Sequence, residues 1–196
     1  MRLGRIEISG SALLVAAVLF YLDREGVIFW LLLACVLHEL GHWWAIYLLG
    51  GKVQGARLSC VGAELRLSPA HPLSPGKLAL AALAGPTVNL LLAVGSGLLA
   101  RSGAGSRLYL FAGINLGLAC FNLLPAERLD GGRILIGLLG GMSREDLAEK
   151  VVWWCSFVVT ILFFFAGGLL LWESGGRNFT LILAGLWVLR TVWEGK

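Results

Sequence analysis

Residues 36–43 read Val-Leu-His-Glu-Leu-Gly-His-Trp and lie near the middle of an apolar run from about residue 27 to residue 49. The run predicts a helix. On a helix, His38 and His42 leave the same face about one turn apart, as two ligands of a tetrahedral zinc ion require. Glu39 points roughly 80° from the mean direction of the two histidines, at about 100° per residue, which suits a metal-bound water better than the metal. The stretch therefore predicts two zinc ligands and one general base.

The His-Glu-x-x-His pattern also has an ordinary explanation. It arises by chance, and a histidine on an apolar helix is usually packed and hydrogen-bonded. Here, however, three ionisable groups occupy five consecutive positions in a segment long enough to span a bilayer. Insertion scales give a cost of about 2.5–3.5 kcal/mol for one charged residue at the centre of a membrane helix. This cost favours the interpretation as a metal site.

The composition indicates a polytopic membrane protein. Of 196 residues, 58% are hydrophobic and 14% are charged, whereas soluble domains contain about 45–50% apolar residues. The formal net charge of +4 is small and distributed among loops, so it bears on topology and indicates no nucleic-acid partner. The four cysteines form no Cys-x-x-Cys pair, which argues against a disulfide framework.

The predicted fold class is an all-α polytopic membrane protein with about six transmembrane helices. Roughly alternating apolar and polar residues over 53–67 add a short membrane-associated β element after the second helix. The first span is expected to be retained, because no small-x-small cleavage site follows it. The predicted spans are residues 8–22, 27–49, 77–100, 108–124, 151–172 and 179–193.

The basic residues predict the orientation of these spans. Twelve of the 16 Lys and Arg residues fall on the side that holds the two termini, and four fall on the other side. The positive-inside rule therefore predicts cytoplasmic termini. His42 lies seven residues before Leu49, or about 10 Å at 1.5 Å per residue, so the site is expected nearer the cytoplasmic face.

Residues 85–89 read Gly-Pro-Thr-Val-Asn and interrupt the predicted third span. Proline inside a membrane helix frees a carbonyl and kinks the axis. Two interpretations of Asn89 stay open: part of a simple kink, or an amide that contacts substrate or a cavity.

Residues 121–133 read Phe-Asn-Leu-Leu-Pro-Ala-Glu-Arg-Leu-Asp-Gly-Gly-Arg. Pro125 disfavours helical geometry at the preceding residue, and the glycines after Asp130 allow a tight turn. Asp130 is therefore expected on irregular backbone at the cytoplasmic end of the fourth span. His42 and Asp130, two potential metal ligands, would then lie at the same depth in the membrane.

With these three stretches in place, the chain resembles the site-2 protease family of intramembrane zinc metalloproteases. It is most similar to the small bacterial branch that includes the stage IV sporulation protease. The resemblance covers nearly the whole length and implies one zinc ion per chain. Position by position, it implies that zinc is bound by His38, His42 and Asp130, and that Glu39 is the catalytic base. It further implies that substrate is positioned by Asn122, Pro125 and Asn89, and the role of Asn89 is the least defined.

The resemblance further implies a zinc-dependent endopeptidase in a bacterial cell membrane. Its substrate would be a membrane-embedded or membrane-associated protein, cleaved in regulated proteolysis that releases a signalling or transcription factor. Residues 1–196 are expected to form one integral-membrane protease domain without a PDZ or nucleotide-sensing domain. Regulation would then come from partner proteins, such as a regulatory membrane partner, or from substrate processing.

Three alternatives remain. A prenyl-protein-type protease would take its third ligand from a glutamate on a later helix, and none stands in a comparable setting here. A non-hydrolytic zinc-binding adaptor that captures partner helices would have no use for Glu39 as a base. A metal transporter would be expected to show an inverted repeat with paired broken helices.

Overall fold

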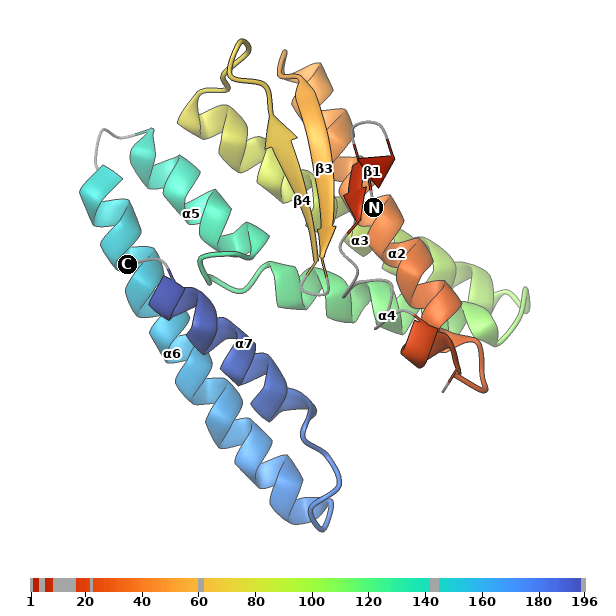
Figure 1. The fold of residues 1–196 in the computed structure, drawn as a ribbon. Helices are drawn as coiled ribbons and strands as arrows, with labels where there is room; N and C mark the ends of the chain where they lie inside the picture. Colours follow the sequence, from red (N-terminus) through yellow and green to blue (C-terminus); the bar gives the residue numbers. More distant parts are fainter. Residues whose placement is uncertain are drawn as a thin grey trace. The chain divides into compact units, whose positions relative to one another are not determined.

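The computed structural model describes residues 2–3, 6–8, 17–21, 23–59, 62–141 and 145–194. The chain divides into two compact units, Met1–Cys120 and Phe121–Lys196, each with its own hydrophobic core. The first contains β1 (Arg2–Leu3), β2 (Ile6–Ile8), α2 (Val27–Leu48), β3 (Val53–Ser59), β4 (Gly62–Leu67), α3 (Pro75–Arg101) and nearly all of α4 (Arg107–Asn122). The second contains α5 (Asp130–Gly140), α6 (Glu145–Glu173) and α7 (Thr180–Glu194) (Figure 1).

The β element predicted over residues 53–67 is confirmed. β3 and β4 pair antiparallel, from Val53 opposite Leu67 to Ser59 opposite Gly62. The sheet is larger than predicted, because β2 pairs parallel with β3 and β1 pairs antiparallel with β2, giving the order β1-β2-β3-β4. The first two strands have only two and three residues, too few for an alternating pattern to indicate a strand.

The predicted first span, residues 8–22, falls mostly outside the described residues. Ile8 is the last residue of β2, and residues 17–21 are helical. Residues 9–16 and residue 22 are not described. A span over 8–22 therefore stays a prediction.

The helix α2, which carries the His-Glu-x-x-His stretch, is held at both ends. The Asp23 carboxylate accepts hydrogen bonds from the backbone N–H groups of Ile28 (2.7 Å) and Val27 (3.1 Å), early amides that lack an intrahelical partner. These bonds, that of Ile28 above all, lower the pKa of Asp23 below its ordinary value. At the other end, Lys77 Nζ donates to the Leu49 carbonyl at 2.9 Å. The helix is thus fixed to the start of α3.

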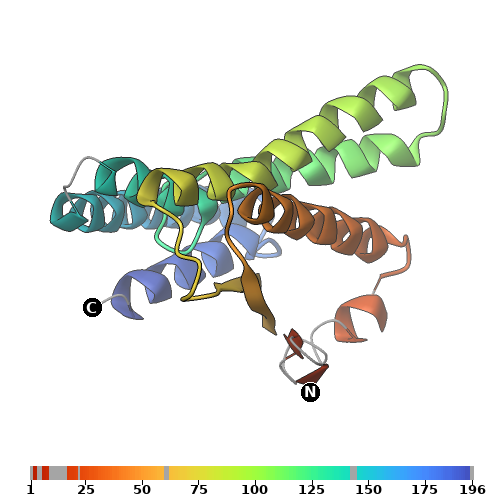
Figure 2. The same ribbon diagram turned by 90° about the horizontal axis from the view of Figure 1, so that it is seen from above.

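The core of the first unit lies where α2 ends. Ile46, Leu73 and Ala81 are buried there and pack against partly buried side chains of the sheet, Val53 and Leu65 among them. Figure 2 shows the sheet on one side of α2 and the hairpin of α3 and α4 on the other. This core therefore places the small sheet beside the helix that carries the histidines.

Three helices among the described residues are long and apolar enough to cross a membrane: α2, α3 and Asp146–Glu173 of α6. The helices α4 and α7, predicted as spans 108–124 and 179–193, have 16 and 15 residues. They rise about 24 and 22 Å, against a hydrocarbon core of about 30 Å. The protein is a mainly helical integral membrane protein with a small sheet, and the prediction of about six spans is not confirmed.

The predicted third span, residues 77–100, falls within α3, which is continuous across Pro86. This proline lacks the N–H that would bond to the Ala82 carbonyl. Pro86 is among the most completely buried side chains, and proline is tolerated inside a membrane helix where neighbouring groups satisfy the backbone. The helix therefore passes the Gly-Pro stretch without ending.

The second unit is built around the hairpin of α6 and α7. These helices lie close together at Gly167, where a Cβ would lie 2.7 Å from Ile182 Cγ1. The buried residues of its core come from the segment before α5 and from both hairpin helices: Ala126, Leu129, Val159 and Val188.

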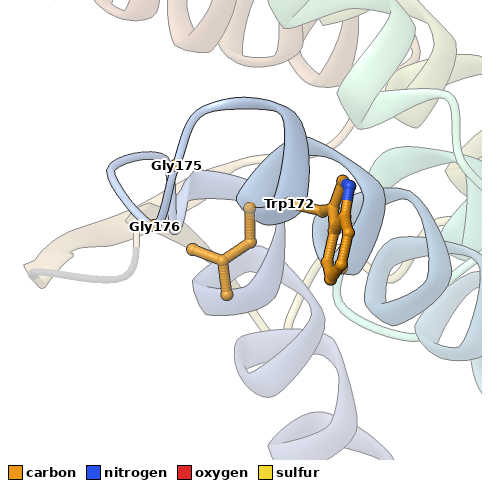
Figure 3. A pocket seen from close by; sticks show the side chains of 5 residues that line it. Trp172, Gly175 and Gly176 are labelled. Carbon is orange, nitrogen blue, oxygen red and sulfur yellow. The ribbon is translucent and has the colours of Figure 1, made fainter.

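A shallow hollow of about 360 Å³ lies at the turn between α6 and α7 (Figure 3). Its wall includes Trp172, Gly175 and Gly176. A second hollow of about 570 Å³ lies between α2 and α3 and is lined mainly by leucine, alanine and tryptophan. Among the described residues, neither hollow is lined by an ionisable side chain, so neither presents a general acid or base.

Candidate metal centre

The two histidines of the His-Glu-x-x-His stretch meet in the interior of the first unit. His38 is 4% and His42 is 7% exposed, and their Nε2 atoms lie 3.0 Å apart. Two nitrogens that bind one tetrahedral zinc ion at about 2.0–2.1 Å are separated by about 3.3 Å. The pair is therefore spaced as two ligands of a single metal ion.

The other nitrogen of each ring already donates a hydrogen bond. His42 Nδ1 lies 2.8 Å from the backbone carbonyl of Ala81, which can only accept, so this nitrogen carries the hydrogen. His38 Nδ1 donates to Asn89 Oδ1. A neutral imidazole with its hydrogen on Nδ1 has a lone pair on Nε2, so two lone pairs face each other across 3.0 Å. Only a shared cation, a proton or a metal ion, makes this arrangement favourable.

Gly85 leaves room for the two imidazoles on the side of α3. A Cβ at this position would lie 2.3 Å from His42 Nε2 and 2.8 Å from His38 Cε1. Gly41 on α2 allows the two helices to approach closely, because a Cβ there would lie 2.9 Å from Val88 Cγ2 and 3.1 Å from the Ala84 carbonyl oxygen. The backbone of α3 thus forms one wall of the site, which explains the glycine of the Gly-Pro stretch.

Two further predicted residues lie in the first unit with the histidines. Glu39 is half-buried on α2, next to His38 in the chain. Asn89 is completely buried on α3, and its amide oxygen accepts the hydrogen bond from His38. A hydrogen bond from the ring nitrogen that does not bind the metal fixes the orientation and tautomer of a ligand histidine.

The remaining predicted residues lie in the segment that joins α4 and α5. Asn122 is the last residue of α4, and Pro125 is half-buried in the irregular stretch 123–129. Asp130 is 5% exposed and is the first residue of α5. The prediction of irregular backbone at Asp130 is wrong by one residue, because Leu129 is the N-cap of α5. The positive end of the helix dipole favours a carboxylate in this first turn.

Close backbone packing holds the segment that carries Asp130. A Cβ at Gly131 or Gly132 would lie 2.3 or 2.1 Å from carbonyl oxygens of the preceding loop. The backbone N–H of Glu127 donates to Ser156 Oγ on α6 at 3.0 Å. The loop is therefore fixed to the second unit, and the backbone direction at Asp130 with it.

Sequence reasoning did not single out the Ala81 carbonyl, Ser156 or a buried amide on α4, Asn115. The side chains of Ser156 and Asn115 are completely buried. A polar residue inside an apolar run was the available signal for them.

Residues 96–166 match Peptidase family M50, a range that includes the Asp130 segment. The chain is 29% identical over 185 residues to the curated protein "Putative zinc metalloprotease Rip3" of Mycobacterium tuberculosis, which covers 90% of this chain and 46% of that protein. A zinc metalloprotease of Clostridium perfringens, also named putative, is 42% identical over 57 residues, or 29% of this chain and 17% of that protein. The chain thus spans less than half the length of these curated relatives.

The fold is similar to that of a solved site-2 protease. The solved Site-2 Protease from Methanocaldococcus jannaschii matches with a TM-score of 0.67 and 24% identity, covering 99% of this chain and 92% of that chain. At this identity the likeness concerns the fold alone. This likeness agrees with the match of residues 96–166 to Peptidase family M50 and with the similarity to curated zinc metalloproteases.

Proposed function

We propose that this protein is a zinc-dependent endopeptidase that cleaves a membrane-embedded or membrane-associated protein. The observation that carries the proposal is the histidine pair. Two buried imidazoles direct their Nε2 lone pairs at each other across 3.0 Å, while both Nδ1 atoms donate to fixed acceptors. Nitrogen ligands at this spacing suit zinc.

Asp130 is the proposed third ligand. Three features support it: its burial, its place at the start of α5, and the Leu-Asp-Gly sequence that resembles the third motif of site-2 proteases. Three protein ligands leave the fourth zinc position for water or substrate, which is the arrangement of a catalytic site. Asn122 and Pro125 are proposed to position substrate beside it. For Asn89, its burial and its bond to His38 favour orientation of the ligand instead.

Zinc would supply Lewis acidity, lowering the pKa of its water to about 7 and polarising the scissile carbonyl. Glu39 would accept the proton of the attacking water and return it to the leaving amine. The two histidines would stay neutral and oriented through their Nδ1 hydrogen bonds. A helical substrate has its carbonyls hydrogen-bonded, so local unwinding must precede attack, and helix-breaking residues near the cut are expected to help.

The proposed orientation of the protein in the membrane follows from the distribution of its basic residues. We place the N- and C-termini in the cytoplasm and the active site nearer the cytoplasmic face, on the charge asymmetry of the loops. Residues 1–196 would act as one protease domain of a bacterial cell membrane, regulated by a membrane partner.

The test combines metal content with cleavage of a co-expressed single-span substrate that carries helix-breaking residues. The wild type is expected to hold one zinc per chain and to cleave. Glu39→Gln should keep the zinc and lose activity by about 10²–10⁴-fold, the usual contribution of a general base. His42→Ala and Asp130→Ala should lose the metal, and Glu149→Gln, at an exposed position of α6, should behave as wild type.

Undiminished cleavage by zinc-loaded Glu39→Gln would refute the mechanism. Zinc binding without cleavage by the wild type would favour the adaptor alternative. Full zinc retention in Asp130→Ala would remove the aspartate from the ligand set.

A further inference from the structure

A chain of buried amides leads away from the metal centre through the first unit. Asn89 Nδ2 on α3 donates to Asn115 Oδ1 on α4 at 2.7 Å, and Asn115 Nδ2 donates to the backbone carbonyl of Phe111 at 2.8 Å. Both asparagines are 0% exposed. The chain therefore runs from a zinc-ligand candidate to the backbone of a neighbouring helix without reaching solvent.

The backbone carbonyl sets the direction of every hydrogen bond in this chain. The Phe111 oxygen can only accept, so the amide nitrogen of Asn115 must face it and the oxygen of Asn115 must face α3. That oxygen also only accepts, so Asn89 turns its nitrogen toward α4 and its oxygen toward His38. His38 must then carry its hydrogen on Nδ1. An amide on one helix thus selects the tautomer of a histidine on another.

Asn89 alone does not determine this orientation. Its amide oxygen and nitrogen have nearly the same shape, so rotation by half a turn about the last side-chain bond exchanges them. The rotated amide would present N–H to His38 Nδ1, which would then have to accept. The hydrogen of a neutral ring would move to Nε2, the nitrogen that faces His42, and that nitrogen would lose the lone pair that binds metal.

We infer that Asn115 is a positioning residue of the metal centre, which acts through Asn89 to keep the Nε2 lone pair of His38 available for zinc. The inference rests on the proposed function and deepens it. Partners of a ligand histidine commonly change metal affinity about 10–100-fold when they are removed. Asn115 acts one bond further out, so its removal is expected to weaken zinc binding about tenfold, at the lower end of that range.

A purely structural role for Asn115 makes different predictions. If its only task were to pack α4 against α3, its loss would lower stability, and its effect on metal affinity would add to that of any other substitution. A residue that acts only through Asn89 should instead have no effect on zinc affinity once Asn89 is removed, because effects within one network are not additive.

The experiment measures zinc affinity by competition with a chelator in detergent, together with thermal unfolding of the metal-free protein. Asn115→Leu is expected to bind zinc about tenfold more weakly. Asn115→Asp should restore binding, because a carboxyl of the same shape still accepts from Asn89. The control is Ser96→Ala, which removes another buried polar group of α3 whose hydroxyl bonds only within its own helix, among the bonds seen here; its affinity should equal that of wild type.

The decisive comparison is the double variant Asn89→Leu with Asn115→Leu. It should bind zinc as weakly as Asn89→Leu alone. Additive losses of affinity, or wild-type affinity in Asn115→Leu, would overturn the inference while leaving the proposed protease intact. Absence of zinc from the folded wild type would overturn both.

Discussion

Replacing Gly85 by alanine tests the proposed centre with a single methyl group. The new Cβ would lie 2.3 Å from His42 Nε2, 2.6 Å from His42 Cε1 and 2.8 Å from His38 Cε1. Ordinary contacts of a Cβ begin at 3.4 Å, so the His42 ring must retreat by at least about 1.1 Å. Ligand geometry generally has to hold within about 0.5 Å. We therefore expect Gly85→Ala to lose zinc and, with it, cleavage.

The matched control is Gly95→Ala, in the same helix. Among the described residues, no atom outside the helix's own nearby backbone lies within 4 Å of a Cβ at that position, and alanine favours a helix interior by about 1 kcal/mol over glycine. Overpacking typically costs about 1–3 kcal/mol, so Gly85→Ala should stay folded. The assay is zinc per chain after gel filtration, with far-ultraviolet circular dichroism to verify folding. A folded Gly85→Ala protein with wild-type zinc affinity would refute the reasoning, because the imidazoles could not then lie against this glycine.

Two further predictions concern the helices around the site. Gly167→Ala should lower the melting temperature of the protein by forcing α6 away from Ile182. Gly168→Ala should not, because its Cβ would meet no other part of the described chain within 4 Å. Equal melting temperatures would mean that the hairpin packs differently. Asp23→Asn should speed hydrogen exchange at the first amides of α2. The pKa of Asp23 is lowered, chiefly by the N–H of Ile28. The stability that the Asp23 carboxylate gives to the start of α2 is therefore complete above the ordinary pKa of 3.8. It is lost as the pH falls through the pKa of the folded protein. If the difference in hydrogen exchange between wild type and Asp23→Asn persisted below the pKa of Asp23 in the folded protein, it would not come from the Asp23 carboxylate.

Some features of the fold could be predicted because they depend on local sequence. The hairpin over 53–67 followed from alternation of residue types, and the helix that carries His38 followed from a long apolar run. The span count did not follow, because apolar content alone does not decide where a helix ends. The run at 108–124 becomes a 16-residue helix.

The sequence by itself determined the chemistry of this protein: two imidazoles one turn apart and a carboxylate beside them. They lie in an apolar segment, where the free-energy cost of ionisable groups indicates that they have a function. Their spacing is a property of one helix and needs no other part of the chain. Tertiary structure alone decided which nitrogen of each imidazole has a lone pair available to bind metal. That choice depends on the Ala81 carbonyl and on Asn89, which lie 39 and 51 residues away in the chain. Hydrogen-bond direction is set by the atoms that face each other, and only the packing of α2 against α3 brings these atoms together.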